Sequence, residues 1–469
     1  MIIEIATKEF RQTMRDGRFR LAAVLFIMLT AMAFITAALR YQSLSAERVR
    51  AQKEVASQWM EQGEKNPHSA AHYGQYAFRP ALPLAFFDSG VQAFEGVSIW
   101  LEAHKRNYAA GRPADDMSPL ARFGEISLAY ILQVLLPLIL LLIAYPSFAA
   151  ERESGTLRQV MASGVTGGQL FLGKFVGLSA SVLLLMLPII GISCLVLVST
   201  SGAAWLAHVV LLAALYLWFM ALMLGLALLV SAVASTARAA LLVLLVIWAL
   251  GNFVVPRIAA DMGRLASPTP SADALLRAIE DDLAAGIDGE TPAAKIEKRR
   301  RQLHALYKVS SDAELPINIQ GVIFGIQDEI SDAVYDRHFS ALEAAIDRQV
   351  DIFETASILS PRMAVMLVSQ EISGTSIGHQ RQFADGAEGF RRELMKTLNR
   401  DITLNSRSGD NAYRSSAALW REAGEYRFVP ERLGASIARC GAPLTVLVLW
   451  TFLIGALAWV AARRLGKIG

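Results

Sequence analysis

The sequence has little cysteine, few charges and no recognisable catalytic set. Only two of its 469 residues are cysteine, Cys194 and Cys440, so no disulfide framework supports a domain outside the cell. Charged residues make up 19% of the chain and the net charge is only +3, which argues against a nucleic-acid-binding protein. No pattern of nucleophile and base stands out, so we expect no enzyme activity in this chain.

Long uncharged apolar runs are what the sequence has instead. Apolar residues make up 54% of the chain, and a helix needs about 20 of them to cross a ~30 Å hydrocarbon core. Runs without Asp, Glu, Lys or Arg predict six transmembrane helices, at residues 21–39, 126–148, 175–200, 205–231, 239–256 and 440–462. The first run is longer than the apolar core of a signal peptide and five more follow it, so we expect it to be retained.

Positive charges near the span ends set the expected orientation. Lys and Arg gather in a predicted interfacial helix (1–20), between the second and third spans (149–174) and after the last span (463–469). Because cytoplasmic flanks collect positive charge, both termini are expected in the cytoplasm. Two large insertions, 40–125 and 257–439, then lie outside. The predicted fold is an all-α integral membrane protein, N-in/C-in, with a mainly helical extracytoplasmic domain built from both insertions.

The second insertion contains one long predicted helix. Between Ile319 and Ala356 the apolar residues recur mostly three or four apart, with charges on the other face, and neither Pro nor Gly interrupts the pattern after Gly325. Such an apolar stripe is unstable in water. We expect it to pack on the segment 380–435, on the first insertion or on a twin subunit.

A short polar segment, ERESGTLRQVMASG at residues 151–164, lies between the second and third spans. Glu151 and Glu153 are expected at the N-terminal end of one short helix, where the helix dipole favours negative charge. The segment is either a capped interfacial helix that only closes a loop, or a docking site for a cytoplasmic partner. Three apolar residues share one predicted face of the helix: Leu157, Val160 and Met161.

The pattern E-R-E-x-G-T-L directly after a span resembles the coupling-helix signature of the ABC-2 type permeases, the membrane subunits of one class of ABC transporter. Other patches resemble a subgroup with large periplasmic insertions after the first and fifth spans: NPHSAAHYGQYAFRP (66–80), LEAH (101–104), VVPR (254–257), SPRMAV (360–365) and GTSIGHQRQF (374–383). The resemblance implies a set of residues that fits a groove of a separate ATPase: Glu151, Arg152, Glu153, Gly155, Thr156, Leu157, Val160 and Met161.

The same resemblance implies an assembly of two permeases, identical or related, and two ATPase subunits in the lipid bilayer of a bacterial cytoplasmic (inner) membrane. ATP and Mg would bind the partner ATPase, and this chain would hold no cofactor. The motion driven by ATP would export or extract a substrate. In the alternative hypothesis the motion transports nothing and only reshapes the outer domain for a periplasmic protein partner.

A nearly complete phosphate-binding loop is present, but its context is wrong. The stretch GQLFLGKF (168–175) ends in Phe175 where the loop needs a Mg²⁺-binding hydroxyl, and it opens a span instead of following a strand. We therefore expect no ATP binding by this chain. Small residues recur every four positions here and form a face on which another helix can approach closely: Gly173, Gly177 and Ser181.

The sequence predicts neither a metal site at its paired histidines nor a nucleic-acid site at its basic run. His68 and His72 are four residues apart, which suits a shared metal ion, but no third ligand is evident, so no metal site is predicted. The run KRRR at 298–301 is expected to be a solvated helix face, and no nucleic-acid partner is predicted.

Overall fold

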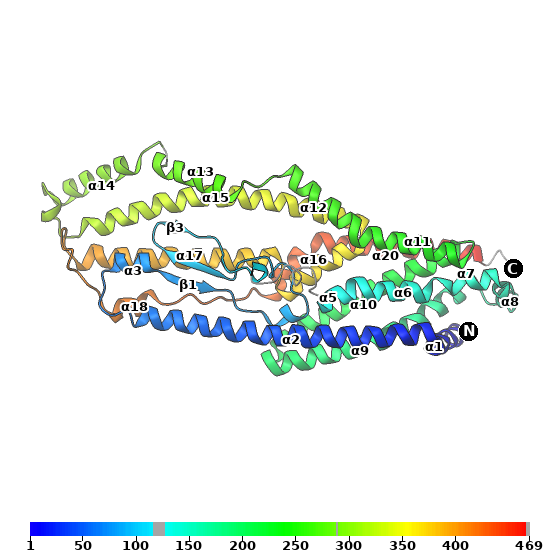
Figure 1. Cartoon of the computed structure of the whole chain (residues 1–469). Helices are drawn as coiled ribbons and strands as arrows, with labels where there is room; N and C mark the ends of the chain where they lie inside the picture. The colour runs from blue at the N-terminus through cyan, green and yellow to red at the C-terminus, as the bar shows by residue number, and fades with distance from the viewer. Residues whose placement is uncertain (116–126, 288, 466–469) are drawn as a thin grey trace.

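In the computed structural model, which describes residues 1–115, 127–287 and 289–465, the protein is an elongated bundle of helices (Figure 1). One end carries α1 (Ile2–Arg15), α8 (Thr156–Ala162) and the C-terminal end of α20 (Gly441–Leu465). The opposite end carries α14 (Pro292–Tyr307) and α18 (Ala417–Ala423). The N-terminus and Leu465, the last described residue, therefore lie at the same end of the molecule, as an even number of crossings requires.

The described residues include six helical stretches that are long and apolar enough to cross a membrane. They confirm the predicted number and order of spans, and the protein is an all-α integral membrane protein. In the first stretch only 17% of the most apolar window is buried within the chain, as expected of a surface that faces lipid or another membrane protein. The six stretches are Gly17–Met60, Leu128–Glu153, Gly167–Thr200, Ala203–Val233, Ala237–Ala266 and Gly441–Leu465.

The first span is part of a much longer helix than the sequence predicted. Helix α2 (Gly17–Met60) has 44 residues and continues well past the predicted end of the span at residue 39. Residues 40–60 contain neither Gly nor Pro, so nothing in the chain ends the helix there. The loss of hydropathy marks where the helix leaves the apolar layer, and not where it ends.

Two other spans contain a π-helical turn. The second span runs through α5 (Leu128–Tyr130), the π turn η3 (Ile131–Leu135), α6 (Leu136–Ala144) and α7 (Pro146–Glu153). The fifth span runs through α11 (Ala237–Ala249), the π turn η5 (Leu250–Val254) and α12 (Val255–Ala266). Pro256 follows the second π turn and lacks a backbone N–H, so the ladder of hydrogen bonds is interrupted there.

The third and fourth spans form a tight hairpin. Helix α9 (Gly167–Ser201) is capped by Thr166, whose side chain accepts a hydrogen bond from the backbone of Gln169. The turn uses Gly202 in a left-handed conformation (φ 71°) and a short 3₁₀ turn, η4 (Ala203–Trp205), before α10 (Leu206–Val233) begins. A glycine suits this turn because larger residues rarely adopt that conformation.

A helix from the second insertion returns to the spans. Helix α16 (Pro361–Ser373) follows the 3₁₀ turn η7 (Ser357–Leu359), and its residues Ala364, Val365 and Val368 are fully buried in the same apolar core as the spans. The short helix α19 (Leu433–Arg439) then leads into α20. The second insertion is therefore joined to the membrane part by packing as well as by the chain.

The rest of the two insertions forms what we call the distal domain: α3 (Pro67–Tyr73), a small sheet, α13 (Ala272–Ala285), α14, α15 (Ile319–Ala356), α17 (Ile377–Asn405) and α18. Its sheet is antiparallel, in the order β1 (Gln75–Phe78), β2 (Ser98–Glu102), β3 (Lys105–Arg106). Three 3₁₀ turns, η1 (Pro83–Phe86), η2 (Pro113–Asp115) and η6 (Asp312–Glu314), complete the described elements. The strands were not predicted, because segments of two to five residues are too short to show an alternating pattern.

Helix α15 confirms the predicted long helix, with the same first and last residues. Its apolar stripe packs within the chain. Ile330 and Val334 join a buried cluster with Leu275 and Ile279 of α13. On another side, two consecutive arginines of α17 form ion pairs with α15: Arg391 with Asp332 and Arg392 with Asp336. The first insertion contributes Tyr108, whose ring stacks on Phe339 with centroids 4.8 Å apart.

Candidate functional site

The 151–164 segment forms two helices, and the predicted single helix is wrong. Helix α7 ends at Glu153, Gly155 adopts a left-handed conformation (φ 74°), and α8 begins at Thr156. Glu151 and Glu153 therefore lie at the C-terminal end of α7, where the helix dipole disfavours negative charge, and not at the start of the following helix. Another interaction must stabilise Glu151 in this position.

That interaction is a buried ion-pair network. The Lys174 ammonium of α9 is 1% exposed and lies 2.8 Å from Oε1 of Glu151 and 3.0 Å from Oε1 of Glu9 on α1. Burial opposes the ionisation of Glu9, but Lys174 and Lys8 outweigh it, so the pKa of Glu9 lies below its ordinary value. Two carboxylates and one central ammonium thus join α1, α7 and α9.

Arg152 anchors the same segment to the fourth span. Its guanidinium donates hydrogen bonds to the backbone carbonyls of Ala232 and Ala234, at the C-terminal end of α10. These carbonyls have no partner within the helix, and a cation also complements the helix dipole there. Thr156 donates a hydrogen bond from Oγ1 to the carbonyl of Glu151 at 3.3 Å, which ties α8 back to α7.

The apolar face of α8 is turned inward. Leu157 is 1% exposed and belongs to the core of the membrane part, with Val160 and Met161 packed against that core. Leu157 is therefore buried within the permease itself, and the role of this face in ATPase coupling stays a prediction. The exposed face of α8 carries Arg158 and Gln159, so any docking partner would meet these polar side chains first.

The small-residue face of α9 is covered by the N-terminal helix. A Cβ atom on Gly173 would lie 2.6 Å from a side-chain carbon of Ile5, and one on Gly177 would lie 2.5 Å from the carbonyl oxygen of Ala6. Glycine is required at both positions for this close approach of α1. Ser181 is buried one turn further along. The helix also contains the whole GQLFLGKF stretch, whose lysine is Lys174, so the stretch is not a phosphate-binding loop.

A family model described as "ABC-2 family transporter protein" matches residues 3–461, nearly the whole chain. The chain belongs to the ABC-2 transporter family. No curated protein matches the sequence. The family is a membrane component of ABC transporters, so this ABC-2 protein is a permease subunit and is not itself the catalytic ATPase. The assignment of the 151–164 residues to ATPase coupling stays a prediction.

A chain of buried polar side chains connects the spans of the ABC-2 protein to its insertions. Gln133, in the π turn of the second span, donates to the Tyr216 hydroxyl of α10 at 2.9 Å, and that hydroxyl lies 2.9 Å from Oγ of Ser369 in α16. Ser369 donates to Asp88 of the first insertion at 2.6 Å. Burial raises the pKa of Asp88. The sequence showed no periodic signal for these residues, which come from three helical elements and a loop.

The two insertions contact each other close to this chain of polar side chains. Arg79 is 1% exposed and donates hydrogen bonds to Oε1 of Gln380 and to the carbonyl of Gly374. Gly90 packs so closely on Thr375 that a Cβ atom there would lie 2.4 Å from its carbonyl oxygen. The segments 66–80 and 374–383 are therefore in contact.

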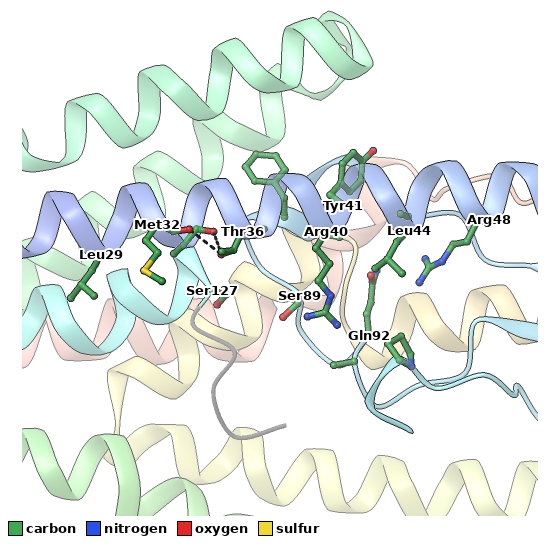
Figure 2. Close-up of a pocket in the computed structure, with 17 residues that line it drawn as sticks. Leu29, Met32, Thr36, Arg40, Tyr41, Leu44, Arg48, Ser89, Gln92 and Ser127 are labelled. Atoms are coloured by element: carbon green, nitrogen blue, oxygen red, sulfur yellow. Dashed lines mark hydrogen bonds between the residues drawn. The ribbon is translucent and has the colours of Figure 1, made fainter. Parts of the chain in front are cut away.

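A pocket of about 410 Å³ opens beside α2 where the helix leaves its most apolar part (Figure 2). Leu29 and Met32 lie at one end of it, and Arg40 and Arg48 lie further along the helix towards the distal domain. Among the described lining residues there are two guanidinium groups and no carboxylate. Apolar and cationic surfaces thus follow one another along a single helix face.

The two histidines of α3 have a neighbour that the sequence did not reveal. His104, in the turn between β2 and β3, brings a ring nitrogen close to those of His68 and His72. The basic run at 298–301 lies in α14 and is partly neutralised: Lys298 lies 2.7 Å from Glu290, and Arg300 lies 2.9 Å from Glu297. It forms a solvated helix face, as predicted.

Proposed function

We propose that this chain is the ATPase-coupled permease of an ABC-2 exporter in a bacterial cytoplasmic membrane. In this proposal both termini and α8 face the cytoplasm, and the distal domain, built from insertions after the first and fifth spans, is periplasmic. Two ATPase subunits and a second permease, identical or related, complete the assembly, and ATP and Mg bind to the ATPases. One observation supports the proposal above all. In this member of the ABC-2 family, the 151–164 segment is fixed to several helices of the membrane part by ion pairs and hydrogen bonds.

The anchoring explains how a short segment can transmit force. Glu151 is held to α1 and α9 through Lys174, and Arg152 is held to the end of α10, so α7 and α8 cannot move without these helices. A partner that pushes on the exposed Arg158 and Gln159 therefore moves α7 and α8 together with α1, α9 and α10. In this role the segment acts as a coupling helix.

The pocket beside α2 supports an amphiphilic anionic substrate. Its apolar end adjoins side chains such as Met32, which is 67% exposed on the surface of the first span. Both guanidinium groups have partners within the chain, such as the Arg79 carbonyl for Arg48, and their positive charge would in addition attract a negatively charged headgroup in the pocket. A molecule with an acyl chain and an anionic head satisfies both ends of the pocket, and it could enter sideways from the bilayer.

Replacement of the exposed side chains of α8 tests whether this helix couples the permease to the ATPase. We expect the double variant Arg158→Glu, Gln159→Trp to lose recovery of the co-expressed ATPase in a pull-down while its melting temperature stays unchanged. The matched control is Arg301→Glu, Gln302→Trp, an equally exposed Arg-Gln pair on α14 in the distal domain. ATPase recovery equal to the control would contradict the proposal. Leu157→Asp is unsuitable, because it places a charge in the permease core.

Binding of a fluorescent anionic phospholipid to the purified protein tests the substrate class. Arg40→Gln should weaken binding, whereas a zwitterionic lipid of the same acyl chain should bind poorly to both proteins. Met32→Trp, which fills the apolar end, should weaken the binding of either lipid. Equal binding of both lipids to the unaltered protein would exclude an anionic headgroup as the feature recognised.

The second candidate function is transmission without transport, and the buried polar chain favours it. Gln133, Tyr216, Ser369 and Asp88 connect the second and fourth spans to both insertions, so span movement reaches the distal domain through them. ATPase stimulation by a purified periplasmic partner, with no lipid movement between leaflets in reconstituted vesicles, would favour this function over export.

A further inference from the structure

Three histidine side chains converge towards the end of the distal domain that lies away from the spans, where α3 and α18 are close together (Figure 1). His68 and His72 lie one turn apart on the same face of α3, and their Nε2 atoms are 3.2 Å apart. His104 comes from the turn between β2 and β3, and one ring nitrogen of each histidine lies within 4.8 Å of the other two. The backbone N–H of Ala103 donates to the carbonyl of Ala71 at 3.0 Å, which fixes this turn against α3.

The spacing of the rings fits a tetrahedral metal ion. The ring centroids form a triangle with one shorter and two nearly equal sides: 4.6 Å (His68–His72), 5.6 Å (His68–His104) and 5.5 Å (His72–His104). For three imidazoles bound to one zinc ion with bonds of about 2.1 Å, tetrahedral angles place the nitrogens ~3.4 Å and the ring centroids ~5.3 Å apart. The rings are also steeply inclined to one another, by 49° to 81°, so they are not a simple stack.

The surroundings hold two of these rings in place. The ring of Phe324 on α15 stacks on His68, with centroids 3.5 Å apart and planes inclined by 2°. Nδ1 of His104 lies 2.8 Å from Oδ1 of Asp328, although the two groups are not aligned as a hydrogen bond, and Oδ2 of Asp328 accepts a hydrogen bond from Asn399 at 2.6 Å. A carboxylate beside a metal-binding histidine orients its ring and raises its basicity.

The backbone supports a specific role for His104. It has φ 60°, a left-handed conformation that is uncommon for residues other than glycine. Holding a histidine in this conformation costs free energy, and such outliers concentrate at functional sites. Access is also available, because His68 lines one cavity, of about 510 Å³, and His72 lines another, of about 290 Å³.

From this geometry we infer that His68, His72 and His104 form a binding site for a divalent transition metal ion of the Zn²⁺ class, with Asp328 orienting His104. Imidazole ligands suit zinc, copper and nickel, and they do not suit Ca²⁺ or Mg²⁺, which prefer oxygen. Three protein ligands leave a fourth position for water or for a group from a partner. All three ligands belong to the first insertion, and Asp328 approaches His104 from α15 of the second insertion.

Metal binding to the full-length protein in detergent tests the inference. The protein carries an affinity tag without histidine and is treated with chelator, and Zn²⁺ is then titrated in a calorimeter. We expect one equivalent of Zn²⁺ per chain. His72→Gln and His104→Asn should each weaken binding at least about tenfold, and Asp328→Asn should weaken it by a factor of about 10 to 100. Asparagine is chosen at position 104 because it tolerates the left-handed conformation.

The control is His338→Gln, in the same domain, whose ring contacts Asp282 at 2.9 Å and lies outside the cluster. It should bind Zn²⁺ like the unaltered protein. Loading with Co²⁺ gives a second measurement, because tetrahedral imidazole ligation produces intense visible absorption, which His72→Gln and His104→Asn should abolish. Absence of stoichiometric binding, or binding that both of these variants retain, would overturn the inference. Elution of the variants as folded dimers or monomers like the unaltered protein excludes misfolding as the cause of a loss.

Discussion

Replacement of Lys174 by methionine should destabilise the membrane part at the 151–164 segment. The change removes the ammonium that lies 2.8 Å from Glu151 and 3.0 Å from Glu9, and leaves two carboxylates whose side chains are only 20% and 9% exposed. Loss of one partner of a buried ion pair costs about 3–5 kcal/mol. Lys8 remains 3.0 Å from Glu9 and 3.6 Å from Glu151 and compensates in part, so we expect a loss of about 2–3 kcal/mol.

The assay is thermal unfolding of the purified permease in detergent, with the triple variant Glu9→Gln, Glu151→Gln, Lys174→Met as the matched control. The triple variant removes all three charges and should recover most of the stability, because neutral replacement of a whole buried ion pair is often tolerated.

The pH dependence of stability follows from Glu9. Its pKa is lowered in the folded protein, so its contribution to the free energy of unfolding is complete above the unfolded pKa of about 4.3 and is lost as the pH falls through the lower folded value. The difference between Lys174→Met and the unaltered protein should therefore be constant from pH 6 to pH 8. A single variant as stable as the unaltered protein, or a triple variant no better than the single, would refute the reasoning.

Three further predictions concern packing and orientation. Gly177→Leu should displace α1 and lower the melting temperature, because its Cβ would lie 2.5 Å from a backbone oxygen, whereas Gly191→Leu on the same helix meets nothing within 4 Å and should be neutral. Ile330→Asp places a charge at a position that is 2% exposed and should cost about 3 kcal/mol or more, seen as faster proteolysis of the distal domain while ATPase recovery persists. In a background without the native cysteines, Ala305→Cys should react with an impermeant thiol reagent in intact cells and Gln159→Cys should not; the reverse result would exclude the proposed orientation.

Patterns that depend on neighbouring residues were predictable from the sequence, and this is clearest in α15. Its apolar stripe has one period over 38 residues, so both ends were predicted correctly. Helix α2 shows the limit of the same reasoning. Its hydropathy falls after residue 39, but the polar residues that follow are good helix formers, so the span was predicted and the helix beyond it was not.

The candidate sites depended on contacts between distant residues, which the sequence does not show. Leu157 was expected to face a partner because it shares one helix face with Val160 and Met161 in a segment that resembles a coupling helix, but in the structure it packs into the core of the spans. His104 follows His72 by 32 residues and reaches it only through the turn between β2 and β3. Asp88 and Ser369 are 281 residues apart and meet only because α16 returns to the spans.

The length of α2 has a mechanical consequence. The helix runs unbroken for 44 residues, about 66 Å at 1.5 Å per residue, and near its far end the Trp59 indole donates a hydrogen bond to the carbonyl of Trp420 at 3.0 Å. An unbroken helix of this length acts as a rigid lever arm. A tilt of about 5° at its N-terminal end displaces its tip by ~6 Å, which is more than one turn of a helix. A small tilt of α2 within the membrane, too small to open a wide channel, therefore produces a large displacement at the far end of the distal domain.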